Sequence, residues 1–82
     1  MKDLLLLFPS IHYVLEAENC LKTLNIEVEL IPVPKELSSD CGMALLINAK
    51  DWPKVSTLYQ TGRLKIEACY LKDEKKYRPF KG

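Results

Sequence analysis

The stretch that decides the fold is Leu4-Leu5-Leu6-Leu7-Phe8-Pro9-Ser10, a short apolar run that stops at a proline and a serine. Such a run is typical of a central strand that is covered on at least one face. After it, apolar residues recur at helical spacing as far as Leu24, with polar residues between them. The stretch therefore predicts a buried strand and then a helix with one core-facing side. Ser10 is expected to cap this helix through its hydroxyl, and Asn25 is expected to end it.

Three further strands are predicted from the same kind of pattern. Residues 27–33 begin with alternating polar and apolar side chains, as a half-buried strand does. Pro32 has no amide hydrogen to donate, so this strand is expected at an edge of the sheet. Residues 43–48 form another short apolar run, and residues 66–71 alternate again.

A second helix is expected between Asp51, which can cap it, and Gly62, which can end it. The order is then β-α-β-β-α-β, whose commonest compact form is the ferredoxin-like, split-βαβ sandwich of the α+β class. This fold has an antiparallel four-stranded sheet with two helices on one face. We expect a single domain over residues 1–73 and a charged, loosely held C-terminal tail over residues 74–82.

Composition narrows the classes of function. A chain of 82 residues is too short for a large enzyme with several sites. Twelve Lys and Arg against eleven Asp and Glu give a net charge of +1, so no overall field attracts nucleic acid or an anionic membrane. The apolar run near Leu4 is too short to span a bilayer, and the acidic Asp3 with no small-residue cleavage site argues against a secretory signal. The expected location is the cytoplasm.

The three cysteines, Cys20, Cys41 and Cys69, are an odd number at wide spacing. They form no C-x-x-C pair, and His12 is the one histidine that could join them at a metal. We therefore expect neither a disulfide scaffold nor a structural zinc site, and no cofactor.

The predicted topology brings unusual residues to one end of the domain. The loop over residues 34–42 is longer than a usual hairpin loop and lies beside the start of the first helix. The second helix ends at the same edge. The residues expected there are Ser10, His12, Lys35, Cys41, Arg63 and Lys65.

Cys41 is the candidate reactive group at this end. A thiolate is the nucleophilic form of cysteine, and backbone amides or cations nearby lower its pKa. Gly42 can bring its amide close to an anionic sulfur, and the hydroxyls of Ser38 and Ser39 can donate to it. Asp40, in contrast, would raise the thiol pKa if its carboxylate pointed inward. The expected binding groups are Gly42, Ser38, Ser39, Lys35, Ser10 and His12.

Each of these residues also has a structural interpretation. Free cysteine is often a small apolar filler, which would leave Cys41 without chemistry. Cys69 is at most a secondary thiol, and His12 projects away from the apolar stripe, as a solvated residue of the first turn does. The residues interpreted as core are Cys20, Trp52 and Tyr59.

Residues 30–45, together with Phe8-Pro9-Ser10-Ile11-His12 and the Ala17-Glu18 helix, resemble the family of small bacterial proteins described as selenium/sulfur carrier protein-like, a domain of unknown function. The resemblance covers nearly the whole chain except the tail, and its most specific part is the string P-x-P-x-x-[LI]-S-x-x-C-G-x-A-L. The family usually has Arg where this chain has Lys35, which keeps the charge but loses the planar two-pronged contact with an oxyanion.

The resemblance implies a carrier that holds sulfur or selenium on Cys41 as a persulfide or perselenide. It also implies a donor protein and an acceptor protein, and it favours a carrier over a turnover enzyme. Two other classes stay open. One is a non-catalytic interaction or regulatory module that dimerises through the open sheet face, since two helices cannot cover every leucine of the first strand. The other is a small thiol enzyme, which lacks a nearby resolving cysteine.

Overall fold

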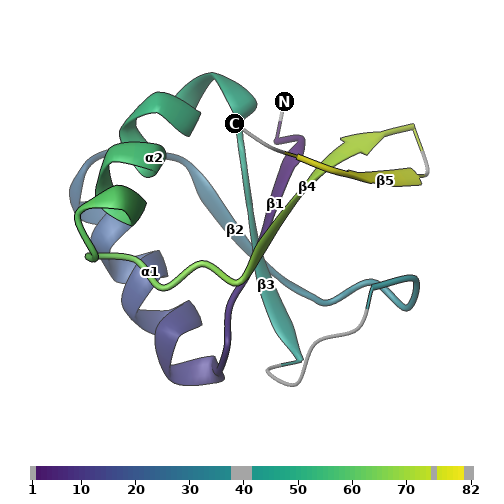
Figure 1. The fold of residues 1–82 in the computed structure, drawn as a ribbon, viewed down its shortest axis with the longest axis horizontal. Coiled ribbons are helices and arrows are strands. Elements are labelled where there is room, and N and C mark those ends of the chain that lie inside the picture. The colour runs from purple at the N-terminus through teal and green to yellow at the C-terminus, as the bar shows by residue number, and fades with distance from the viewer. Residues whose placement is uncertain (1, 38–41, 75, 81–82) are drawn as a thin grey trace.

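The structure is a computed structural model that describes residues 2–37, 42–74 and 76–80. Two helices lie on one side of an antiparallel sheet (Figure 1). The elements are β1 (Leu4–Leu7), α1 (Ile11–Thr23), β2 (Val28–Pro32), β3 (Met43–Ile47), a 3-10 turn (Ala49–Asp51), α2 (Trp52–Gln60), β4 (Ala68–Asp73) and β5 (Lys76–Pro79).

The sheet has five strands in the order β2-β3-β1-β4-β5, and every neighbouring pair is antiparallel. The predicted α+β class is confirmed, and β2 lies at an edge as Pro32 indicated. The prediction of a four-stranded ferredoxin-like sheet is wrong. Residues 76–79, assigned to the tail, form β5 and pair with β4. The single domain over residues 1–73 stays a prediction, but the sheet continues beyond it.

The turn between β4 and β5 explains why the sequence did not reveal the fifth strand. Tight hairpin turns need a positive φ, which glycine and asparagine usually supply. Here Glu74 takes that conformation, with φ of 57°. The turn therefore lies in a run of charged residues with no glycine, and it carries no turn signal.

The main core lies between the helices and the sheet. It contains the buried side chains of one face of the sheet and of one side of each helix: Leu4, Leu6, Phe8, Val14, Ala17, Leu21, Leu45, Ile47 and Val55. Both helices end with backbone hydrogen bonds that satisfy carbonyls of the last turn. The amide of Ile26 donates to Leu21 O and that of Arg63 donates to Leu58 O, with Asn25 and Gly62 at positive φ. The predicted ends of both helices are confirmed.

The other face of the sheet carries a second apolar cluster of Leu5, Leu7, Ala44 and Leu46. Side chains of the β4–β5 hairpin and of residues 31–37 pack against it, including Tyr70 and Tyr77. Leu5 is fully buried and Leu7 is 2% exposed. All four leucines of β1 are thus covered by the chain itself, so β1 offers no apolar surface to a second copy.

Candidate functional site

The structure brings part of the predicted site to one end of the sheet. Leu7, at the end of β1, pairs with Ala44 and Ala68, near the starts of β3 and β4. The start of α1 and the start of β3 lie at this end (Figure 1). Cys41, Ser38 and Ser39 lie outside the described residues, so their expected roles stay predictions.

The base of the β2–β3 connection is closed by backbone pairing. Pro32 pairs with Met43, and the amide of Val33 donates to Gly42 O at 3.1 Å. On the β2 side, the amide of Leu37 donates to Pro34 O at 3.0 Å, which forms a turn that contains the exposed Lys35. Gly42, the neighbour of Cys41 in the chain, is therefore anchored to the end of β2.

The backbone conformation at position 42 favours glycine. Its φ is +75°, which L side chains rarely adopt, and a Cβ there would meet no atom of residues 2–37, 43–74 or 76–80 within 4 Å. None of the described residues beyond its chain neighbours would block a ligand atom at this point of the backbone.

Ser10 precedes α1 with the extended backbone of an N-cap residue, φ −153° and ψ 165°. Its hydroxyl makes no capping hydrogen bond, so the predicted side-chain cap is wrong. The Ser10 carbonyl instead accepts from the amides of Tyr13 at 3.1 Å and Val14 at 3.2 Å. Helix amides at such an end carry partial positive charge, which favours an anion nearby.

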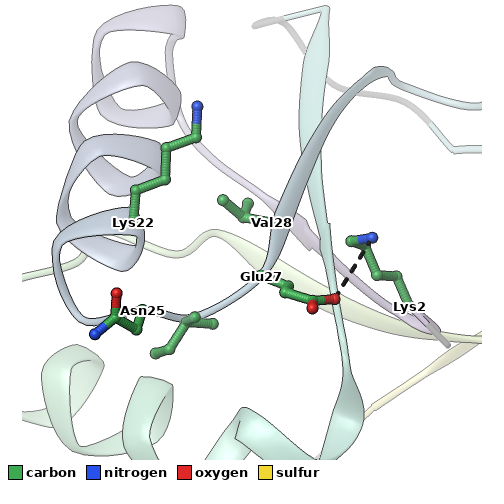
Figure 2. A pocket seen from close by; sticks show the side chains of 6 residues that line it. Lys2, Lys22, Asn25, Glu27 and Val28 are labelled. Atoms are coloured by element: carbon green, nitrogen blue, oxygen red, sulfur yellow. Dashed lines mark ion pairs between the residues drawn. The ribbon is translucent and has the colours of Figure 1, made fainter.

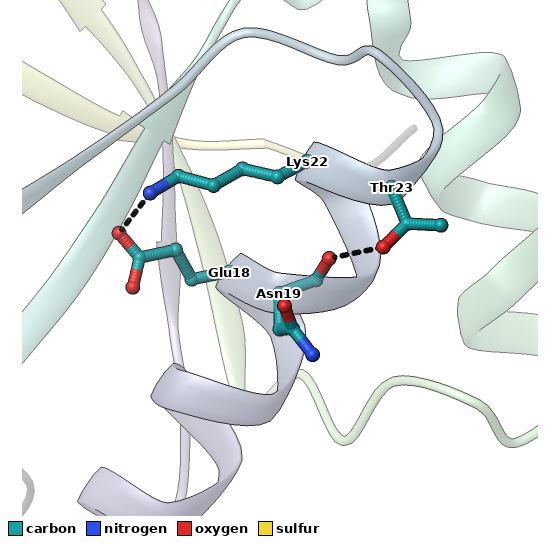
Figure 3. Close-up of polar contacts among 4 residues, drawn as sticks. All are labelled: Glu18, Asn19, Lys22 and Thr23. Carbon is teal, nitrogen blue, oxygen red and sulfur yellow. Dashed lines mark hydrogen bonds and ion pairs between the residues drawn. The ribbon is translucent and has the colours of Figure 1, made fainter.

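His12 lies on the exposed side of α1, with 75% of its side chain exposed. Its Nε2 is 3.4 Å from the carboxylate of Glu16, one turn further along, and its ring meets Tyr13 edge-on. This agrees with a solvated residue of the first turn. The polar side of α1 continues in the same way, with Lys22 paired to Glu18 at 3.3 Å and the Thr23 hydroxyl donating to Asn19 O (Figure 3).

A hollow of about 380 Å³ lies at the other end of α1, between Lys22, Asn25 and the start of β2 (Figure 2). Its two lysines already contact carboxylates, since Lys2 is 3.9 Å from Glu27 and Lys22 pairs with Glu18. The hollow is therefore a poor site for an anion, and it lies away from the start of α1.

The two cysteines in the described part of the chain, Cys20 and Cys69, are half-buried. Cys20 packs beside the main core, as predicted. Cys69 also packs there, and burial raises the pKa of its thiol from 9.0 to about 11. Within residues 2–37, 42–74 and 76–80, no three His, Cys, Asp or Glu side chains are grouped so that they could hold a metal ion. No helix in this described part is long and apolar enough to cross a membrane.

Residues 3–71 match the family model described as "Putative Se/S carrier protein-like". The chain belongs to this family. The predicted family is thus confirmed, and the match takes in Ser10, His12, Lys35, Cys41 and Gly42 but not β5. No curated protein and no solved structure matches the chain.

The interpretation of Tyr59 as a core residue is wrong, whereas Trp52 packs beside the main core as predicted. Tyr59, interpreted as core, is 47% exposed and lines a second pocket together with Trp52 and Cys69. The helical spacing of Tyr59 from Trp52 indicated a shared face. It did not indicate that this face lines a pocket. Phe80 completes the pocket, and it lies after β5, far from α2 in the sequence.

Proposed function

We propose that the protein is a selenium/sulfur carrier that holds a persulfide or perselenide on Cys41 and passes it to an acceptor protein. The observation that carries the proposal is the family match over residues 3–71, which includes Cys41 and Gly42. Two features of the fold support it. Gly42 is anchored to the end of β2, and the start of α1 lies at the same end of the sheet.

The transfer step needs no metal and no external oxidant. The Cys41 thiolate attacks the terminal sulfur of a donor persulfide, the donor S–S bond breaks, and the donor leaves as a thiolate. Cys41 then carries the S–S⁻ group, and the same exchange passes the terminal atom to the acceptor. Selenium follows the same course through an S–Se bond. Helix amides and Gly42 are the groups we expect to stabilise the anion. A cytoplasmic location belongs to this proposal, because thiols stay reduced there.

Intact mass spectrometry tests the carrier role directly. The protein is incubated with a cysteine desulfurase and cysteine, or with a selenocysteine lyase and selenocysteine, and the expected gain is the mass of one sulfur or one selenium atom. A variant with Cys20→Ala and Cys69→Ala should gain the same mass, since it keeps Cys41. If Cys41→Ser gains it as well, Cys41 is not the carrier group.

The alternative of a module that dimerises through an open sheet face has lost its motivating observation. Leu5 and Leu7 are buried by residues of the same chain. We therefore propose no second function, and a homodimer stays a prediction.

A further inference from the structure

A pocket of about 300 Å³ lies between α2, the start of β4 and the residue after β5. Its size is at the lower end of the range of small-molecule sites. The side chains that matter for its chemistry are Trp52, Ser56, Tyr59, Glu67, Cys69 and Phe80.

Aromatic rings form much of its wall. Trp52 and Phe80 meet edge to face, with ring centroids 5.3 Å apart and an interplanar angle of 89°. The amide of Phe80 donates to Cys69 O at 2.9 Å, which fixes Phe80 against β4. Tyr59 lies two turns after Trp52 on α2 and is 47% exposed. The rings therefore come from two separate parts of the chain and are held in place by the fold.

Among the described lining residues, the charge of the pocket comes from one carboxylate. Of the described residues that line it, only Glu67 has a side chain that is charged at neutral pH. The Glu67 amide donates to Leu7 O at 2.7 Å, so the backbone that carries this carboxylate is tied to β1. The Cys69 thiol stays neutral, because burial raises its pKa to about 11. The described lining residues thus combine aromatic rings with one negative charge.

We propose that this pocket binds a small organic cation, namely an ammonium group carried on a compact apolar body. The apolar body would pack against Trp52 and Phe80, and the ammonium would lie near Glu67, with Ser56 as a further acceptor. Aromatic faces attract cations through the negative charge of their π-systems, and a carboxylate adds to that attraction. An anion would meet Glu67, and none of the described lining residues is a lysine or an arginine that would offset the repulsion. This proposal does not depend on the carrier chemistry of Cys41.

The protein itself supplies the reporter for a test, since Trp52 is the one tryptophan of the chain. Benzylammonium is the probe, with benzyl alcohol and benzoate as its neutral and anionic counterparts. Titration of Trp52 fluorescence at pH 7.5 should show saturable binding of benzylammonium, weaker binding of benzyl alcohol and no binding of benzoate. Cys41→Ser should bind the probe as the wild type does, so failure of the carrier role leaves this result unaffected.

Two variants decide whether the pocket is the binding site. Glu67→Gln should weaken benzylammonium binding roughly three- to fivefold, the effect of one solvated ion pair, and leave benzyl alcohol binding unchanged. Glu29→Gln removes an exposed carboxylate of β2 that does not line the pocket, and it should change nothing. The proposal is overturned if all three probes bind alike, if Glu67→Gln binds the cation as the wild type does, or if no saturable signal is seen up to the solubility of the probe. Far-UV circular dichroism verifies that each variant is folded.

Discussion

The Cys69 thiol is half-buried at the margin of the main core, and desolvation is the reason that its pKa rises from 9.0 to about 11. A thiol with this pKa is almost entirely protonated at neutral pH, and thiolate is the form that attacks sulfur or an alkylating agent. Cys69 therefore contributes packing and not nucleophilic chemistry. This agrees with its interpretation as at most a secondary thiol.

The raised pKa predicts a loss of stability at alkaline pH. Below pH 9 the thiol is protonated in the folded and the unfolded chain, and the stabilising effect is complete. Between pH 9 and pH 11 the unfolded chain releases the proton first, so the free energy of unfolding falls. Urea unfolding at pH 8 and pH 11 measures this effect. The free energy of unfolding should fall further between these pH values for the wild type than for Cys69→Val, because the variant lacks the thiol and keeps every lysine and tyrosine. Equal falls in the free energy of unfolding would contradict a raised pKa of the Cys69 thiol in the folded protein.

Gly42 leads to a prediction about the backbone beside Cys41. Gly42→Ala should lower the free energy of unfolding by about 1 to 2 kcal/mol, because a Cβ disfavours the positive φ. Gly42→Asn should cost less, since asparagine tolerates this conformation better. Urea midpoints of the two variants measure the difference. An alanine variant as stable as the wild type would mean that this turn changes its conformation without cost.

At the scale of elements, the start of α2 is stabilised by a residue far away in the chain. The Ala49 amide, at the start of the 3-10 turn, donates to the Asp3 carboxylate at 2.9 Å. Asp51, the predicted cap, already has a helical backbone, with φ −88° and ψ −2°, and makes no side-chain capping bond. The predicted side-chain cap by Asp51 is therefore wrong, because the helical backbone begins at Ala49, two residues earlier than the local sequence indicated.

The non-local cap gives a matched pair of variants. Asp3→Ala should lower the free energy of unfolding by about 1 to 2 kcal/mol, since it leaves the Ala49 amide without its partner. Asp51→Ala removes a carboxylate that caps nothing, and it should cost much less. Urea unfolding of both variants at pH 7 checks this. An order of effects opposite to this one would show that Asp51 is the functional cap.

The elements also show what the sequence could predict. Strands and helices with regular apolar spacing were found within a few residues, and Asn25 and Gly62 marked both helix ends because a positive φ has a residue preference. Contacts between distant segments were missed. Asp3 caps a turn 46 positions away, and Ser10 uses its carbonyl and not its hydroxyl. No local pattern specifies such pairs.

For the whole molecule, the sequence could predict those parts of the candidate site whose position follows from the order of the strands and helices. The order β-α-β-β-α-β brings the start of α1 and the connection after β2 to one end of the sheet, and the Cys41-Gly42 string indicated the family. The aromatic pocket could not be predicted, because it needs Phe80 to return to Trp52 after β5. That return depends on the hairpin turn at Glu74, which carries no sequence signal.

The last prediction concerns β5 and the expected boundary at residue 73. A chain that ends at residue 73 loses the strand that covers the edge of β4, together with Tyr77 of the second apolar cluster and Phe80 beside the main core. Each half-buried aromatic side chain contributes about 1 kcal/mol or more through its buried apolar area. We expect the truncated chain to unfold at a clearly lower urea concentration and to associate through the bared edge of β4.

The matched control is a chain that ends at Phe80, which keeps β5 and both aromatic contacts and should have the stability of the full chain. Light scattering reports association, and tryptophan emission reports the environment of Trp52, which should become more polar only in the shorter chain. If the chain ending at residue 73 is as stable and as monodisperse as this control, β5 is dispensable. Residues 1–73 would then be the complete folding unit, as the sequence alone had indicated.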